Sequence, residues 1–131
     1  MANPKYPQTS TSDSATLSAA NTGEDGSGTI VTISTGTATG MKYLHTLYWS
    51  AIGNTTAGML KFAVYNGSIY VPVLRIPIEP RTLSYTWPPT VALYGSVPLP
   101  NIELPSASWT LVGWTHIAET FKVMVQGQEY V

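Results

Sequence analysis

Carboxylates are the side chains of this 131-residue sequence that could perform acid–base catalysis, and the chain holds seven of them. Glycoside hydrolysis needs two carboxyl groups that face each other across the scissile bond. Glu79 and Glu119 could approach each other in a folded domain, but no motif in the sequence pairs them. We therefore expect that the protein is not an enzyme, and a glycan hydrolase is the enzymatic alternative.

Metal and cofactor chemistry has few candidate residues. The histidines are His45 and His116, whereas a zinc site uses three or four ligands at recognisable spacing. The chain has no cysteine, which removes thiolate ligands, thiol nucleophiles and disulfides. The common nucleophile, phosphate-binding and dinucleotide-binding motifs do not occur. We expect neither a metal nor a cofactor.

Aromatic side chains offer a different chemistry, which is stacking. The chain has four tryptophans and eight tyrosines, which could stack on sugars or form a core and an oligomer interface. Tyr85 and Trp87, followed by Pro88 and Pro89, lie in a proline-rich segment and are the candidates for an exposed contact. We favour an interface for these residues, with sugar binding as the alternative.

Charge is scarce in this chain. Charged residues make up 10% of the sequence, against about a quarter in an average globular protein, and the formal net charge is −1. No basic surface is therefore expected for a nucleic acid. No apolar stretch approaches the roughly 20 residues that span a bilayer, and the N-terminus lacks the apolar core of a signal peptide. We expect a soluble protein made in a cytoplasm, without a nucleic-acid or membrane partner.

The elements that must position these residues are predicted to be strands. Short β-branched and aromatic runs separated by turn signals occupy residues 29–34, 42–52, 59–65, 69–78, 108–115 and 119–126. No segment combines helical periodicity with caps. Seven or so short strands of this kind predict an all-β fold, and specifically a jelly-roll-like antiparallel β-sandwich.

Turn and proline residues add detail to this prediction. Asn66-Gly67 between two apolar runs predicts a tight hairpin, because such turns require positive φ angles. Pro72 and Pro77 cannot donate to a ladder, which indicates an edge strand or a bulge in residues 69–78.

Residues 1–28 are rich in Ser, Thr, Asn and Gly and predict an extended N-terminal arm that ends in a glycine-rich turn. Such an arm is either a disordered tail or a segment that orders against a neighbour. Tyr6 and Leu17 are its candidate contact residues. We therefore expect the single sandwich domain to comprise residues 29–131.

Residues 80–107 contain six of the ten prolines. We expect this segment to cross the domain as irregular chain, with short strands near residues 91–93 and 101–104. A connection of this length is usually functional or packs at an interface.

Three segments together resemble a family of small proteins encoded in the structural modules of tailed bacteriophages. They are ATLSAANTGEDGSGTIVTI (15–33), GNTTAGMLKFAVYNG (53–67) and THIAETFKVMVQGQEY (115–130). These are turn and strand residues, so the resemblance concerns a fold rather than a chemistry. The aromatic run 42–52 and the proline-rich segment 80–107 depart from the family pattern.

The resemblance implies a virion structural protein made in the host cytoplasm. The resemblance leaves the place in the particle open, and the small size, the missing catalytic residues, the low charge and the extended arm fit a capsid decoration (cement) protein best. Such proteins bind the assembled lattice of the major capsid protein on the capsid surface, commonly as homotrimers. The alternative is a receptor- or glycan-binding module of a head fibre, tail fibre or baseplate.

Overall fold

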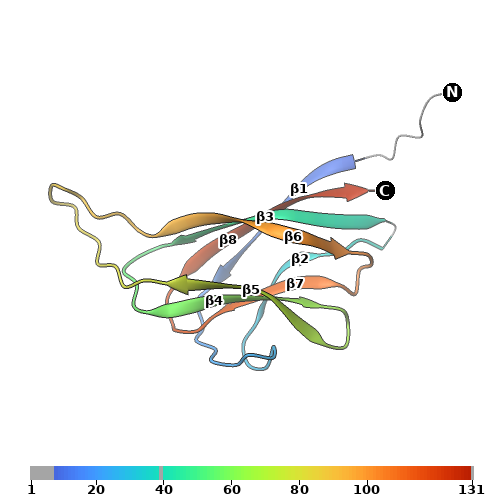
Figure 1. Cartoon of the computed structure of the whole chain (residues 1–131), viewed down its shortest axis with the longest axis horizontal. Helices are drawn as coiled ribbons and strands as arrows, with labels where there is room; N and C mark the ends of the chain where they lie inside the picture. Colours follow the sequence, from blue (N-terminus) through green and yellow to red (C-terminus); the bar gives the residue numbers. More distant parts are fainter. Residues whose placement is uncertain (1–7, 39, 131) are drawn as a thin grey trace.

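The protein is a two-layered β-sandwich (Figure 1). The computed structural model describes residues 8–38 and 40–130, and within these residues every regular element is a β-strand. The strands are β1 (Gln8–Leu17), β2 (Val31–Thr35), β3 (Met41–Ala51), β4 (Gly58–Tyr65), β5 (Tyr70–Ile78), β6 (Tyr94–Leu104), β7 (Thr110–Thr115) and β8 (Phe121–Tyr130). The predicted all-β antiparallel sandwich is confirmed.

The strand order defines the architecture further. One sheet has the order β1-β8-β3-β6 (sheet A) and the other the order β2-β7-β4-β5 (sheet B). The first strand pairs with the last, the second with the seventh, the third with the sixth and the fourth with the fifth, all antiparallel. This winding of one long hairpin over two sheets is the eight-stranded jelly roll.

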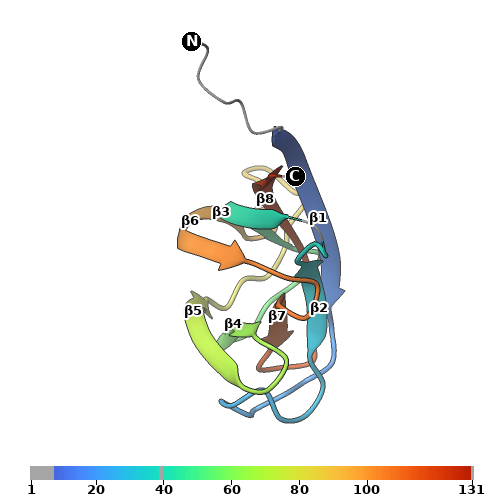
Figure 2. The same cartoon turned by 90° about the vertical axis from the view of Figure 1, so that its right-hand side faces the viewer.

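The winding sorts the connections between the two ends of the sandwich. The β1–β2, β3–β4, β5–β6 and β7–β8 connections gather at one end, here called the loop end (Figure 1). The β4–β5 hairpin and the β2–β3 and β6–β7 connections lie at the other, the hairpin end. Strands β1 and β2 form one long side of the sandwich, and β5 and β6 form the other (Figure 2).

The core lies between the sheets and follows from strand alternation, which sends every second side chain inward. Its largest fully buried side chains include Phe62, Phe121, Leu44, Leu47 and Leu111. Each such side chain stabilises the fold by about 1.5–3 kcal/mol relative to an exposed position. A cysteine-free chain depends on this core.

Residues 8–17 correct the predicted N-terminal arm. They form β1, which pairs with β8 in unbroken register from Gln8–Tyr130 to Leu17–Phe121. The inward positions of β1 before Leu17 are small or polar, so the strand has no apolar alternation in the sequence. The sandwich domain therefore already includes residue 8, and the boundary expected after residue 28 is wrong.

Residues 94–104 correct the prediction of irregular chain over residues 80–107. They form one strand, β6, which contains Pro98 and Pro100 and pairs with β3 alone. An edge strand tolerates proline because one side of it donates no ladder hydrogen bonds. The irregular parts of the predicted segment are therefore residues 80–93, in the β5–β6 connection (79–93), and residues 105–107, in the β6–β7 connection; the short strand expected near residues 91–93 does not form.

The predicted hairpin between β4 and β5 is confirmed. Asn66 N–H donates to the Ile69 carbonyl (3.3 Å), and Asn66 Oδ1 accepts hydrogen bonds from the N–H groups of Ser68 and Ile69. Gly67 has a φ of 95°, which favours glycine. Strand β5 is an edge strand whose register with β4 shifts at a bulge, as Pro72 and Pro77 predicted.

Candidate functional site: an exposed aromatic loop

The β5–β6 loop, residues 79–93, projects beyond the loop end of the sandwich (Figure 1). Near its outer end Ser84 and Thr90 form an antiparallel bridge with N–H···O distances of 3.1 and 3.0 Å. The five residues between them, Tyr85-Thr86-Trp87-Pro88-Pro89, are here called the aromatic tip. The two prolines fix their own φ angles and so limit the conformations of the tip.

The aromatic tip exposes its side chains almost completely. Tyr85 is 93% and Trp87 91% exposed, and Pro88 and Pro89 are exposed beside them. Tyr94, at the start of β6, is a further exposed aromatic residue. Exposed apolar surface that is gathered in one place marks interaction sites in soluble proteins. The tip is therefore the candidate contact surface of this chain.

The base of the loop is braced by the β3–β4 turn. Thr55 and Arg81 exchange two backbone hydrogen bonds of 2.8 and 2.9 Å, and the buried Thr55 hydroxyl donates to the Glu79 carbonyl at 2.7 Å. Leu83 N–H donates to Asn54 Oδ1 at 2.8 Å. These contacts hold the loop out from the domain, so a partner would meet a partly preorganised surface.

The β3–β4 turn is itself fixed to the β7–β8 connection. The N–H and the hydroxyl of Thr56 both donate to Glu119 Oε1, at 2.8 and 2.6 Å. The segment GNTT, residues 53–56, thus links three loops at the loop end. Its role is to support the aromatic loop.

The other two predicted contact residues are Leu17 and Tyr6. Leu17 is completely buried in the core between the sheets, so it has no surface to offer another chain, and its assignment as an interface residue is corrected. It is buried because it is the inward residue that ends β1. Tyr6 lies outside the described residues.

A second apolar surface lies on the β5/β6 side of the sandwich, toward the hairpin end. Here a groove of about 380 Å³, the edge groove, opens between the edge strands of the two sheets. Its apolar lining is Val64, Val71, Val73, Pro100, Ile102 and Trp109. Asn66 and Glu103 are the polar residues that line it.

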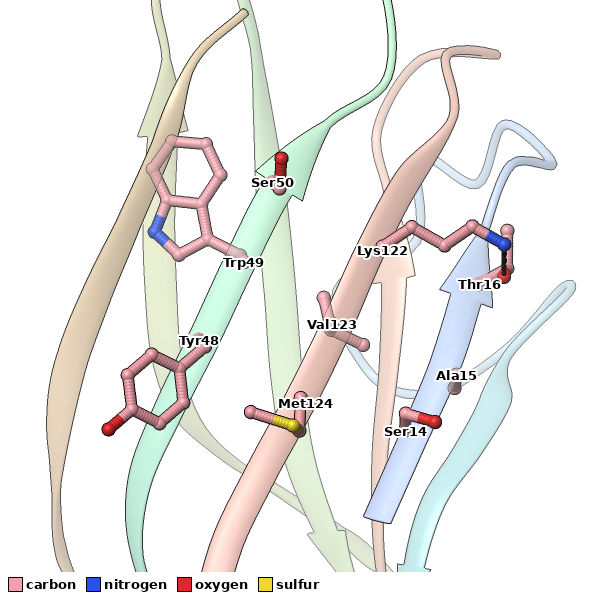
Figure 3. Close-up of a pocket in the computed structure, with 9 residues that line it drawn as sticks. All are labelled: Ser14, Ala15, Thr16, Tyr48, Trp49, Ser50, Lys122, Val123 and Met124. Carbon is pink, nitrogen blue, oxygen red and sulfur yellow. Dashed lines mark hydrogen bonds between the residues drawn. The ribbon is translucent and has the colours of Figure 1, made fainter. Parts of the chain in front are cut away.

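A third feature is a shallow hollow of about 460 Å³ on sheet A, formed by β1, β8 and β3 (Figure 3). Tyr48, 38% exposed, and Met124 contribute apolar surface, and Ser14, Thr16 and Ser50 contribute hydroxyl groups. Lys122 Nζ donates to Thr16 Oγ1 at 2.8 Å across the strands (Figure 3). An aromatic ring among hydroxyl groups is a chemistry that suits a small polar ligand.

The buried charges are structural. Lys42 Nζ donates to Asp13 Oδ2 (2.8 Å), Ser34 Oγ (3.2 Å) and the Thr35 carbonyl (3.1 Å), which uses its three protons. Burial alone would raise the pKa of Asp13, but the hydrogen bonds from Lys42 and Ser34 outweigh it and lower the pKa. This cluster joins strands of both sheets on the β1/β2 side.

A second charged cluster lies on the outer face of sheet B. The buried Lys61 Nζ donates to Glu24 Oε1 at 2.7 Å, and Arg75 donates to Glu24 Oε2 at 2.6 Å. His116 Nδ1 lies 3.5 Å from Lys61 Nζ. The hydrogen bond from Lys61, followed by the charges of Arg75 and Lys61, lowers the pKa of Glu24. The cluster fastens the β1–β2 loop to the sheet.

The two histidines contact different residues. His45 is exposed on β3 and contacts Thr46, far along the chain from His116 and its Lys61 neighbour. Across residues 8–38 and 40–130, no group of three or more His, Cys, Asp or Glu side chains is placed to hold a metal ion. The same residues contain no helix long and apolar enough to cross a membrane.

Comparison with known proteins identifies no family for this chain. The chain matches no protein-family model and no curated protein. Among solved structures, it is similar to a chain in the structure of the infectious bursal disease virus Gt strain, with 13% identity and a TM-score of 0.28. The match covers 92% of this chain and 40% of the viral one. A TM-score of that size does not define a shared fold, so function has to be inferred from this chain's own surface.

Sequence reasoning missed the brace and the edge groove. Asn54 and Thr55 were identifiable as turn residues, but their partners lie 24 to 29 residues further along the chain. The groove combines side chains of β4, the β4–β5 hairpin, β5, β6 and the β6–β7 connection, and no local pattern contains it. Trp109 was the one signal, as an aromatic residue at the start of an apolar run.

Proposed function

We propose that the protein is a non-catalytic structural protein of a bacteriophage virion, and specifically a capsid decoration protein. The observation that carries this proposal is the aromatic tip. Tyr85 and Trp87 are held out on a braced loop with more than nine-tenths of each side chain in water. Such surface is costly to leave exposed and is enriched in the anchors of protein interfaces. The tip is proposed to contact a neighbouring subunit in the assembled particle.

Three further properties support the proposal. Three segments resemble small structural proteins of tailed bacteriophages, as described above. The jelly roll is common in viral capsid domains, although the same fold also occurs in lectins and enzymes, so it is compatible with the role without defining it. The low charge suits attachment through apolar contacts, which salt screens only weakly.

The proposed action follows from binding equilibria. A protein that binds only the assembled lattice of the major capsid protein stabilises that lattice by mass action. As a homotrimer it would gain effective concentration once one subunit has docked. The proposed location is the outer surface of the capsid, after synthesis in the host cytoplasm.

The test is the copy number and position of the chain in purified particles, combined with a double variant of Tyr85→Ala and Trp87→Ala. We expect hundreds of copies on the head, loss of the variant from particles, and earlier release of DNA on heating when the protein is missing. A handful of copies at the tail, or particles equally robust without the protein, would refute decoration.

The sheet A hollow favours a second candidate, which is a receptor- or glycan-binding module of a head fibre, tail fibre or baseplate. Tyr48 supplies a ring on which a sugar could stack, and Ser14, Thr16 and Ser50 supply hydroxyl partners. Under this alternative, Tyr48→Ala abolishes binding to host surface polysaccharide and adsorption to cells, while the tip variant leaves both unchanged. Under the decoration proposal, the tip variant is lost from particles, whereas the Tyr48→Ala protein is retained on them.

A further inference from the structure

The aromatic tip and the edge groove are complementary surfaces of one chain. The tip carries two large aromatic side chains and no charge. The groove is lined by six apolar side chains, with Glu103 its only charged residue. Its volume of about 380 Å³ exceeds the roughly 150 Å³ cavity that holds a benzene molecule, so it can accept an aromatic side chain.

One polar residue of the groove, Glu103, matches the polar atoms of the tip. A buried Tyr hydroxyl or Trp indole N–H needs an acceptor. Glu103 lines the groove and supplies acceptor oxygens, whereas Asn66 Oδ1 already accepts hydrogen bonds from Ser68 and Ile69. The groove therefore offers an apolar wall for the rings together with a carboxylate acceptor for an N–H or O–H group.

The two surfaces lie at opposite ends of the molecule, so a chain cannot fill its own groove. The tip extends from the loop end, whereas Asn66, Val71 and Trp109 adjoin the connections of the hairpin end (Figure 1). A contact between different patches of identical chains is heterologous, and it repeats until it closes a ring or grows as a fibre.

We propose that the aromatic tip of one copy inserts into the edge groove of the next copy, which joins the chains head to tail into a ring. This inference rests on the proposed function in taking the tip as an assembly surface, and it names the surface that receives the tip. The groove recognises an uncharged aromatic hairpin, and the occupant is a second copy of this chain.

The area involved predicts that each single contact is weak. Two aromatic side chains bury roughly 300–500 Å² together. A stable complex buries about 800 Å² on each partner. One docked tip therefore supplies about half of what a lasting dimer needs, and a closed ring, in which every copy is held on both sides, supplies the rest by multivalency.

The absence of cysteine allows a direct test by disulfide trapping. One variant carries Thr86→Cys on the tip and a second carries Val71→Cys in the groove, where Val71 is 49% exposed. Mixed and oxidised, the two full-length variants should form a disulfide-linked heterodimer. The matched control pairs Thr86→Cys with Ser14→Cys, which is exposed on the outer face of sheet A. Equal yields in both mixtures, or Thr86→Cys dimers alone, would overturn the proposal.

A second measurement follows self-association of the free protein by sedimentation. Trp87→Ala and Val71→Lys should each weaken it about tenfold or more, as expected for the loss of an interface anchor. Both positions are exposed, and urea unfolding verifies that each variant is folded. If Val71→Lys associates like the wild type, the groove is not the receiving surface and the proposal falls.

The outcomes separate this inference from the proposed function. Particles that lose the Trp87→Ala protein while Thr86→Cys and Val71→Cys fail to pair would refute the groove and keep decoration. Specific pairing in a protein that is missing from purified particles would keep the head-to-tail contact and refute decoration.

Discussion

Two long loops leave the loop end of the sandwich, and they differ in how their side chains are used. The β1–β2 loop, residues 18–30, is glycine-rich and polar, yet it folds back over the outer face of sheet B. The β5–β6 loop, residues 79–93, carries the largest exposed aromatic side chains of the described chain, yet it projects into solvent. The polar loop is therefore the packed loop, and the aromatic loop is the exposed one.

The β1–β2 loop is held by internal hydrogen bonds centred on Asn21. Its side-chain amide donates to the carbonyls of Ser27 and Thr29, both at 2.8 Å, and its Oδ1 accepts from Gly23 N–H at 2.9 Å. Gly26, with a φ of 87°, lies so close to the Tyr70 ring that an added Cβ would be 2.4 Å from it. The loop therefore needs its glycines in order to pack.

The β1–β2 loop covers the outer face of sheet B, and this explains why both faces of β4 are buried. Phe62 and its inward neighbours face the main core, while Lys61 and Ala63 on the opposite face are also buried, beside Trp114. Trp114 Nε1 donates to the Gly23 carbonyl at 3.1 Å. The comparison shows that the polar β1–β2 loop packs as part of the fold. The tip of the aromatic β5–β6 loop does not pack on the domain, so its side chains are available for a contact.

The largest expected effect on folding comes from Asn21→Ala. The change leaves one N–H and two carbonyl groups of the loop without partners, and we expect a loss of about 2–4 kcal/mol in the free energy of unfolding. Urea unfolding followed by tryptophan fluorescence measures it. The exposed neighbour Thr22→Ala is the control, with a change within about 0.5 kcal/mol. Equal midpoints for the two variants would show that the loop is not anchored through Asn21.

A smaller effect is expected from Glu24→Gln, and it depends on pH. The pKa of Glu24 is lowered in the folded protein, so the carboxylate contributes stability above its unfolded value of about 4.5, and this is lost as the pH falls through the folded pKa. The difference in unfolding free energy between wild type and variant should therefore be full at pH 7 and vanish in strong acid.

The control for Glu24 is Glu79→Gln, since Glu79 forms no ion pair within the described residues. Its stability difference from wild type should stay small at both pH values. A pH-independent difference for Glu24→Gln would mean that the charge of Glu24 does not fasten the β1–β2 loop.

The hydrogen bonds that brace the aromatic loop should contribute less to the free energy of unfolding than Asn21 or Glu24 does. Thr55→Val keeps the shape of the side chain and removes the hydrogen bond to the Glu79 carbonyl, while both backbone bonds to Arg81 remain. We expect a loss of about 1 kcal/mol, together with faster proteolytic cleavage within residues 79–93. Thr82→Val, at an exposed position of the same loop, is the control. Unchanged cleavage would show that the Thr55 hydroxyl does not support the loop.

The smallest effect on stability is expected at the aromatic tip itself. Trp87→Ala should change the free energy of unfolding by less than about 0.5 kcal/mol, because the indole contacts solvent in the isolated chain. A loss of more than 1 kcal/mol in a monomeric sample would show that Trp87 packs on its own domain and would remove the contrast between the two loops.

Much of the fold could be predicted because alternation marks most strands after residue 28. Strand β1 could not, since its inward residues Thr11, Asp13 and Ala15 give no apolar signal and its position depends on β8, more than a hundred residues away. Strand β6 was obscured by Pro98 and Pro100, which only an edge position tolerates.

The candidate site likewise has one part that could be predicted from the sequence and one part that could not. The exposed positions of Tyr85 and Trp87 were predictable because prolines and aromatic residues without alternation have no place in a sheet. The edge groove was not predictable, since it exists only where Val71 and Ile102 of different sheets come together. Local composition can indicate which residues stay outside the sheets and exposed. The groove that is proposed to receive them depends on the packing of distant strands.

The pairing of β1 with β8 also sets how the domain responds to force. Gln8 and Tyr130 are direct partners at one end of sheet A, so pulling on the two ends of the chain acts across the ladder rather than along it. Antiparallel hydrogen bonds run perpendicular to the strands, so such tension would load them one after another and unzip β1 from the sheet. A load that enters through the aromatic loop and leaves through the hairpin end would instead run along the strands and stress many bonds at once. The sandwich should therefore resist stretching along its length far better than tension applied between its terminal strands.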